Sequence, residues 1–180
     1  MKGIVFTQLL EMVEEQFGYD IADKVILDSE LPNDGIYTAV GTYPHEELMT
    51  ILERLQERTD ISIPQLMYEY GKHLFGVFTS MYSHFIKDVD DLFEFLQQID
   101  GHIHKEVLKL YPDAELPKFR YELTDEGNTL LMYYSSQRKM ADFAEGLLMG
   151  AITYFGEKVM VNRENLDDGT NVKFVIQKQQ

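Results

Sequence analysis

The spacing of hydrophobic residues changes after position 110, and this change constrains the fold more than any other feature of the chain. Up to that point hydrophobic residues recur every three or four positions, as on one face of a helix. This spacing predicts five helices, over residues 3–17, 20–28, 42–57, 62–85 and 89–110. Further along, apolar and polar residues alternate on both sides of two turn sequences, which is typical of β-hairpins. These hairpins are predicted at 118–136 and 158–177, with a helix at 139–155 between them.

The order of these elements favours one fold class. Helices come first, then a hairpin, a helix and a second hairpin, and no strand–helix–strand unit is repeated. The prediction is an α+β fold with a helical N-terminal part and a mixed C-terminal part that contains an antiparallel sheet. A chain of 180 residues is the usual size of one domain, so residues 1–180 are expected to form a single domain.

Composition excludes several kinds of function. The chain has 31 acidic and 16 basic residues and a net charge of −15, so neither nucleic acid nor an anionic membrane is expected as a partner. Cysteine is absent, which excludes disulfides, thiol catalysis and cysteine-bound metals. The N-terminal residues lack the pattern of a signal peptide, and no apolar run approaches the roughly 20 residues of a membrane span. The protein is therefore expected in the cytoplasm.

The sequence Tyr-Ser-Ser-Gln-Arg at 134–138 indicates an anion-binding surface. It reads as the end of a strand, where alternate side chains share one face. Tyr134, Ser136 and Arg138 would then present a phenol, a hydroxyl and a guanidinium along roughly 13 Å, at about 3.3 Å per residue. Three hydrogen-bond donors, one permanently charged, suit one or two anionic groups. The alternative is a strand edge whose polar tips are merely solvated.

A single histidine is the candidate metal ligand. His104 lies late in the predicted helix 89–110, next to Ile103 on the apolar face. A neutral imidazole is the best ligand that this chain offers to iron, copper or zinc. His102 would face another direction on a helix, so the two do not form a chelate. A surface or half-buried histidine with a local hydrogen bond is the alternative.

Taken together, these two weak signals point to heme. A flat apolar macrocycle with two carboxylate tails needs an apolar slot, one imidazole for its iron and a rim of cationic donors. The chain has no zinc-protease motif, no glycine-rich phosphate loop and no nucleophile elbow, and an enzyme is not expected.

At this point the chain resembles the heme nitric oxide/oxygen-binding (H-NOX) family, which comprises the sensor domain of soluble guanylate cyclases and bacterial stand-alone relatives. The resemblance covers essentially all 180 residues and includes "MKGIVF", "IHKEVLKLYPDAELP" and "YYSSQR". It implies heme b (iron protoporphyrin IX) between the two parts of the fold, with His104 as the iron ligand. Tyr134, Ser136 and Arg138 would hold the propionates, and Pro117 would press on the heme. The implied pocket residues are Val5, Leu9, Leu74, Phe78, Phe143 and Leu147, with Gly71 as a small residue in the distal helix.

The resemblance also implies a function. Oxygen-binding relatives carry a tyrosine at the place of Phe143, and some bacterial relatives bind zinc through cysteines, which this chain lacks. The expected protein is a nitric oxide sensor with a five-coordinate ferrous heme that also binds carbon monoxide. Stand-alone members act on separate partners, commonly a histidine kinase or a cyclic-di-GMP enzyme, and the same is expected here.

Three alternatives are open at the level of sequence. The first is an oxygen sensor or carrier on the same fold, which would need a distal hydrogen-bond donor. The second is a heme enzyme such as a peroxidase or nitric oxide dioxygenase, which usually needs a polar distal acid or base. His73, beside Leu74, is one polar residue that either could use. The third is a heme-free interaction module.

Overall fold

Four helices form the N-terminal half of the molecule in the computed structural model, which describes residues 1–87 and 89–179. They are α1 (Gly3–Phe17), α2 (Tyr19–Asp28), α3 (His45–Thr59) and α4 (Ile63–Met81). The apolar faces of these helices meet in one core, which includes Phe6, Leu9, Met12, Val13, Leu48, Ile51, Leu52 and Leu55. The Ser62 hydroxyl begins α4 by accepting a hydrogen bond from the Gln65 amide at 3.4 Å. The helical spacing of the sequence therefore located this half well.

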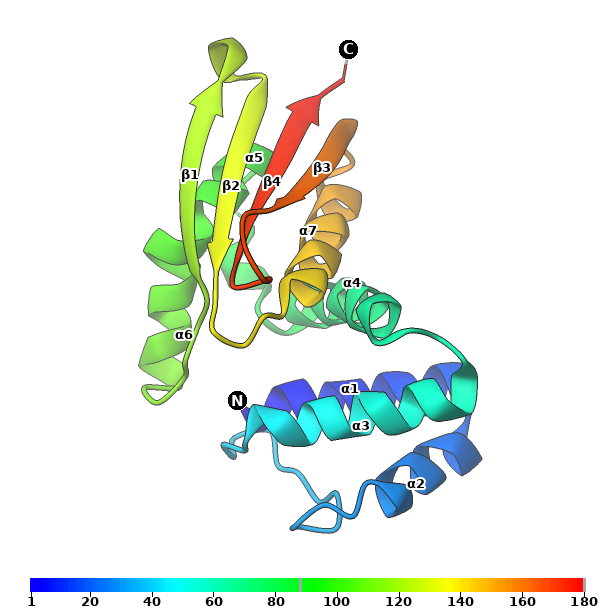
Figure 1. The fold of residues 1–180 in the computed structure, drawn as a ribbon. Coiled ribbons are helices and arrows are strands. Elements are labelled where there is room, and N and C mark those ends of the chain that lie inside the picture. Colours follow the sequence, from blue (N-terminus) through cyan, green and yellow to red (C-terminus); the bar gives the residue numbers. More distant parts are fainter. Residues whose placement is uncertain (88, 180) are drawn as a thin grey trace.

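A four-stranded antiparallel sheet forms the C-terminal half (Figure 1). Its strands are β1 (Lys118–Thr124), β2 (Thr129–Ser135), β3 (Val159–Asn165) and β4 (Asn171–Lys178), in the spatial order β1-β2-β4-β3. Helix α7 (Ala141–Phe155) connects the two hairpins. A second core contains side chains of the sheet, α5 and α7, among them Leu92, Leu96, Leu130, Leu148, Val172, Phe174 and Ile176. This arrangement confirms the predicted α+β fold.

The long helix predicted over residues 89–110 is interrupted. Helix α5 (Leu92–Gln98) is followed by a π-helical turn at Ile99–Ile103 and then by α6 (His104–Leu110). The predicted helix is therefore present from Leu92 to Leu110, but its π-helical turn was not predicted, because one wide turn hardly disturbs the apolar spacing. Such turns insert a residue into a helix and are frequent at functional sites. Here it lies directly before His104.

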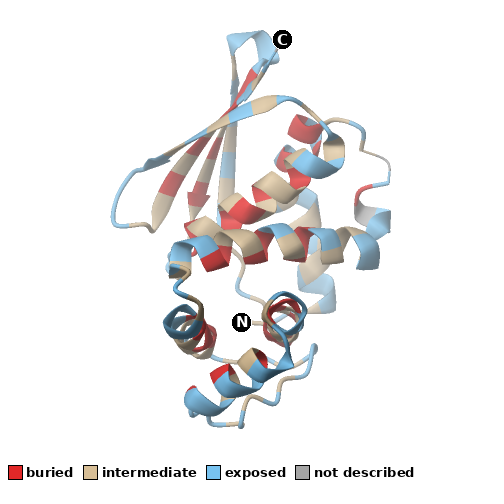
Figure 2. Cartoon of the chain, turned by 90° about the vertical axis from the view of Figure 1, so that its right-hand side faces the viewer, coloured by how far each residue is buried: buried red, intermediate tan, exposed pale blue. Residues whose placement is uncertain are grey.

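Helices α4 and α7 cross at two glycines and thereby join the two halves. A Cβ atom on Gly71 would lie 2.3 Å from the Phe143 carbonyl oxygen, and one on Gly146 would lie 2.0 Å from the Tyr68 carbonyl oxygen. The two backbones are therefore in direct contact. Figure 2 shows buried residues on the sides where the helices face one another. No helix in the described part of the chain is both long enough and apolar enough to cross a membrane.

Candidate functional site

A cavity of about 640 Å³ lies between the helical half and the sheet half. Its lining is mostly hydrophobic, and its volume is typical of a pocket for a small molecule or cofactor. One part of the lining comes from α1, α4 and α7 and includes Val5, Leu74, Phe78, Phe143 and Leu147. The other part comes from α6, the loop that follows it, β1 and β2, and includes His104, Val107, Pro117, Phe119, Met132 and Tyr134. Figure 1 shows α6 and β1 on one side of the molecule and α4 and α7 on the other.

His104 lines this cavity from the first turn of α6. Its side chain is 16% exposed, and its ring lies 5.8 Å from the ring of Phe119. The Nδ1 atom is 3.3 Å from Asp100 Oδ1, four residues earlier. Because a carboxylate only accepts hydrogen bonds, this contact places the proton on Nδ1 and leaves the lone pair of Nε2 for another partner.

Burial lowers the pKa of His104, and the Asp100 carboxylate partly opposes that effect. Burial therefore favours the neutral imidazole, which is the form that binds a metal. His102 is exposed and does not line the cavity. The two histidines are thus separated as the sequence predicted, although through the π-helical turn rather than a regular helix.

Tyr134, Ser136 and Arg138 all line the cavity, but not as three alternate positions of one strand. Strand β2 ends at Ser135, and the chain then turns, with Lys139 at a positive φ of 53°. The predicted common strand face was therefore wrong for Ser136 and Arg138. The turn brings the three side chains to the same cavity by another route.

Hydrogen bonds order this turn. The hydroxyl of Tyr134, which is only 3% exposed, accepts a hydrogen bond from the Met140 amide at 3.2 Å. The Ser136 hydroxyl accepts one from the Arg138 amide at 3.2 Å. The Ser136 hydroxyl also bonds the Tyr134 hydroxyl, so of the two hydroxyls only that of Tyr134 keeps its proton for donation. Burial raises the pKa of Tyr134, so its hydroxyl is a donor at neutral pH.

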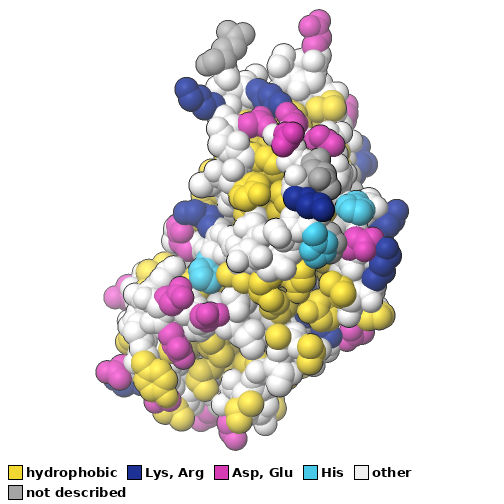
Figure 3. Space-filling view, turned by 180° about the vertical axis from the view of Figure 1, so that it is seen from behind, with side chains coloured by type: hydrophobic (Ala, Val, Ile, Leu, Met, Phe, Trp, Pro, Cys, Tyr) yellow, Lys and Arg dark blue, Asp and Glu magenta, His cyan; other side chains and the backbone are white. Residues whose placement is uncertain are grey.

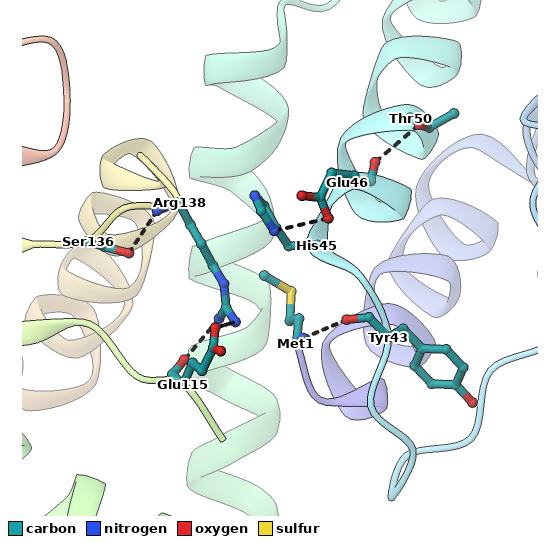
Figure 4. A network of polar contacts seen from close by, with 8 residues as sticks. All are labelled: Met1, Tyr43, His45, Glu46, Thr50, Glu115, Ser136 and Arg138. Atoms are coloured by element: carbon teal, nitrogen blue, oxygen red, sulfur yellow. Dashed lines mark hydrogen bonds and ion pairs between the residues drawn. The ribbon is translucent and has the colours of Figure 1, made fainter. Parts of the chain in front are cut away.

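Arg138 lies at the mouth of the cavity, where several charged groups meet (Figure 4). Its Nη1 donates to the Glu115 carbonyl at 2.9 Å, and its Nη2 donates to the Glu115 carboxylate at 2.6 Å. On the other side of the mouth, His45 Nδ1 lies 3.2 Å from Glu46 Oε2. The Met1 ammonium donates to the Tyr43 carbonyl at 2.6 Å. Burial, and to a smaller extent the positive charge of Arg138, lowers the pKa of this ammonium group.

A second polar cluster at the mouth connects the start of α1 to the loop after α6. Lys2 Nζ lies 2.7 Å from Thr42 Oγ1 and 3.2 Å from Asp113 Oδ1. Thr42 donates its hydroxyl proton to Asp113 Oδ2 at 2.5 Å. Lys2 also lies over the ring of Tyr111, 5.2 Å from the centroid. These contacts link the helical half directly to the segment that carries His104.

Most of the wall residues suggested by sequence line the cavity, with two exceptions. Leu9 is fully buried in the helical core, and Gly71 lies in the crossing of α4 with α7. Neither residue is part of the lining. Both residues lie one layer behind the lining. Gly71 lies where α4 crosses α7 and a side chain would not fit, and Leu9 packs in the core between α1 and the other N-terminal helices. The roles of these two residues toward a cofactor, which the resemblance implies, stay predictions.

Three polar features of the site did not emerge from the sequence. Asp100 could have been found from its i, i+4 spacing to His104. Glu115 could not, because its partner Arg138 is 23 residues away. Tyr82 and Tyr111 also line the cavity, with their hydroxyls 3.5 Å apart, and this contact and burial raise the pKa of Tyr82 to about 12.

His73 does not line the cavity. Its Nε2 atom is buried and has no hydrogen-bond partner in the described part of the chain. The residue is therefore not placed to serve as a distal donor.

The acidic character of the chain makes the mouth unusual. On the face seen in Figure 3, Asp and Glu side chains are scattered over both halves of the molecule, while hydrophobic atoms gather near the middle. Against a net charge of −15, the mouth brings together Arg138, Lys2 and an ammonium group. The same mouth carries Glu46, Asp113 and Glu115, so a carboxylate of a ligand would meet cations that already lie beside acidic groups of the chain.

The residues present fit a heme group. The cavity offers an apolar volume, the His104 imidazole, whose neutral form is favoured by burial, and a guanidinium that already binds a carboxylate. Such a cavity suits a flat, apolar cofactor that carries carboxylates and binds through one histidine.

Comparison with known proteins agrees with this description. The family model described as haem-NO-binding (HNOB) matches residues 2–163. The structure is similar to that of an unliganded Fe(II) H-NOX protein from K. algicida, at 41% identity, a TM-score of 0.94, and coverage of 100% of this chain and 97% of the other. A Shewanella woodyi H-NOX in the Fe(II)CO state, bound to IWP-051, is 40% identical with a TM-score of 0.85 and coverage of 99% and 95%. An S. oneidensis H-NOX in the Fe(II)NO state is 28% identical, with a TM-score of 0.91 and full coverage of both chains.

The chain therefore belongs to the haem-NO-binding, or H-NOX, family, whose members are heme-based gas-sensor domains rather than catalysts.

Proposed function

We propose that this protein is a nitric oxide sensor that holds heme b in the cavity between its two halves and signals to a separate protein. His104 is the axial ligand of a five-coordinate ferrous heme, and nitric oxide and carbon monoxide are its gas ligands. When bound, the heme supplies an iron with one open coordination position. Residues 1–180 act as one sensor domain.

The observation that carries this proposal is the environment of His104. His104 lines the cavity, burial favours its neutral form, and its Nδ1 atom lies 3.3 Å from Asp100 Oδ1, which leaves Nε2 as the nitrogen for a metal. A histidine that ligates a metal usually donates its other ring proton to a carboxylate or carbonyl in this way. His102 is exposed and is not in the cavity lining, so it serves as the natural comparison.

The carboxylates of the cofactor are assigned to the mouth. Tyr134 has a hydroxyl proton to donate, Ser136 lies beside it, and Arg138 supplies a permanent charge. Pro117 lies in the same lining, in the loop after α6, from which it would press on the cofactor. The five wall residues Val5, Leu74, Phe78, Phe143 and Leu147 enclose it with apolar surface.

Selectivity for nitric oxide over oxygen is assigned to the apolar surroundings of Phe143. Its ring has no donor, and the ring of Tyr70, 5.3 Å away, belongs to a residue whose hydroxyl donates to the Val5 carbonyl. Tyr82 follows Tyr70 by 12 residues, which corresponds to about 18 Å along a helix. It is therefore remote from Phe143. Neither tyrosine therefore offers an acid or base beside Phe143 for peroxidase-type chemistry.

Signalling is assigned to a separate partner such as a histidine kinase or a cyclic-di-GMP enzyme. The stand-alone character of related proteins suggested this from the sequence. The strongly acidic surface suits a partner with a basic face.

Absorption spectra of the purified protein test the proposal. Heme binding predicts a strong Soret band, and the ferrous form should change its spectrum with nitric oxide and with carbon monoxide but not with air. A spectral change in air that reverses on removal of oxygen would favour the oxygen-sensor alternative. Failure to take up heme at all would favour a heme-free interaction module.

A further inference from the structure

The guanidinium that is assigned to a heme propionate already holds a carboxylate of the chain itself. Arg138 reaches from the turn after β2 to the loop after α6, where it meets both the carbonyl and the carboxylate of Glu115 (Figure 4). The contact of Nη2 with the carboxylate, at 2.6 Å, has the length of a charge-assisted hydrogen bond. Glu115 thus uses guanidinium donors that would otherwise be available to a propionate.

We propose that Glu115 competes with a heme propionate for Arg138 and thereby weakens the retention of heme. This inference rests on the proposed function, because it concerns the same cofactor at the same cavity. It assigns a role to a residue outside the Tyr-x-Ser-x-Arg motif. That role is to set the rate at which the cofactor leaves.

The difference in exposure between Glu115 and Arg138 explains why a propionate can replace Glu115. The Glu115 side chain is 83% exposed, whereas that of Arg138 is 18% exposed. When the pair opens, the Glu115 carboxylate returns to water at little cost, so the pair itself is weak. The bond from Arg138 to the Glu115 backbone carbonyl, at 2.9 Å, does not depend on that carboxylate. It can continue to orient the guanidinium.

The other acidic groups of the mouth are not in the same position. Asp113 is bonded to Lys2 and Thr42, and Glu46 lies beside His45. In the described part of the chain, Arg138 is the only side chain bonded to the Glu115 carboxylate. A propionate that binds Arg138 therefore competes with the Glu115 carboxylate for the guanidinium. When the propionate is bound, the two negative charges, that of Glu115 and that of the propionate, lie close together and repel each other.

Removal of the negative charge of Glu115 should therefore strengthen heme retention. In Glu115→Gln, the side chain keeps its size and the backbone carbonyl contact remains. The experiment loads the full chain with heme and follows its transfer to excess apomyoglobin by absorbance. Loss of heme is expected to slow by about two- to fivefold, which is the range that an exposed ion pair supports. Equilibrium thermal unfolding of the heme-free forms checks that the variant is folded.

Two controls separate this effect from a general change of charge. Glu122 is exposed on β1 and has the same charge, so Glu122→Gln should lose heme at the wild-type rate. The pair Arg138→Ala and Arg138→Ala/Glu115→Gln should lose heme equally fast, because the gain from Glu115→Gln requires the guanidinium.

The outcomes are distinct. A rate in Glu115→Gln equal to that of the wild type would overturn the inference while leaving the proposed function intact. Faster heme loss from Glu115→Gln than from the wild type would also overturn the inference, because Glu115 would then be needed to position Arg138. A wild-type chain that takes up no heme would overturn the proposed function and, with it, this inference.

Discussion

Replacing Gly146 by alanine should force α4 and α7 apart. The added Cβ would lie 2.0 Å from the Tyr68 carbonyl oxygen and 2.9 Å from the Cα of Gly71. Both neighbours are backbone atoms, so no change of rotamer can relieve the overlap. Overpacking of this kind costs about 1–3 kcal/mol of unfolding free energy. For a chain of this size, each kcal/mol corresponds to about 2–4 °C, so the melting temperature should fall by about 2–12 °C.

Thermal unfolding followed by circular dichroism measures this effect, and the chain offers a matched control on α4. A Cβ on Gly76 would meet no atom within 4 Å, and its φ is compatible with alanine. Gly76→Ala should therefore raise the unfolding free energy by about 0.4–1 kcal/mol, as Gly-to-Ala changes do at compatible sites. A Gly146→Ala protein that unfolds at or above the wild-type temperature would refute the reasoning that the crossing requires glycine.

Three further predictions concern the cavity. Arg138→Ala should lose more heme than Ser136→Ala, because a guanidinium brings a positive charge and can donate two parallel hydrogen bonds to a carboxylate, whereas a serine hydroxyl donates one and has no charge; equal retention, measured by heme content after gel filtration, would contradict this. Phe143→Tyr should raise the oxygen affinity of the ferrous protein by about 10- to 150-fold if the new hydroxyl contributes a hydrogen bond of about 1.5–3 kcal/mol. Oxygen titration measures this affinity, and an unchanged value would mean that the hydroxyl does not reach the gas. Nitric oxide should alter hydrogen exchange in residues 1–18 and 100–117, because the contacts at Asp113 join these segments; identical exchange in the ferrous and nitrosyl forms would count against a two-state switch.

Periodicity predicted the elements well where local spacing alone decides them. The helix at 3–17 matches α1, and both hairpins formed as expected around turns that contain Gly127 and Gly169, each at positive φ. These features depend on residues close in sequence, so the pattern contains them. The candidate residues His104 and Arg138 both line the cavity, and their roles toward a cofactor stay predictions.

What the sequence could not give depends on backbone hydrogen bonding and on distant partners. The π-helical turn before His104 and the end of β2 at Ser135 change the backbone without changing the apolar pattern. Leu9 showed the spacing of a buried residue, but burial in the helical core and burial at the cavity leave the same signature. The partnership of Arg138 with Glu115 joins two loops and exists only in the folded chain.

The central claim, that His104 ligates the heme iron, is tested most directly by exchange of that side chain. His104→Gly, purified with and without added imidazole, is compared with His102→Ala by absorption spectroscopy. The account predicts weakened or lost heme in His104→Gly, recovery of the Soret band with imidazole, and an unchanged spectrum for His102→Ala. An unchanged spectrum for His104→Gly, or heme loss in His102→Ala instead, would contradict it.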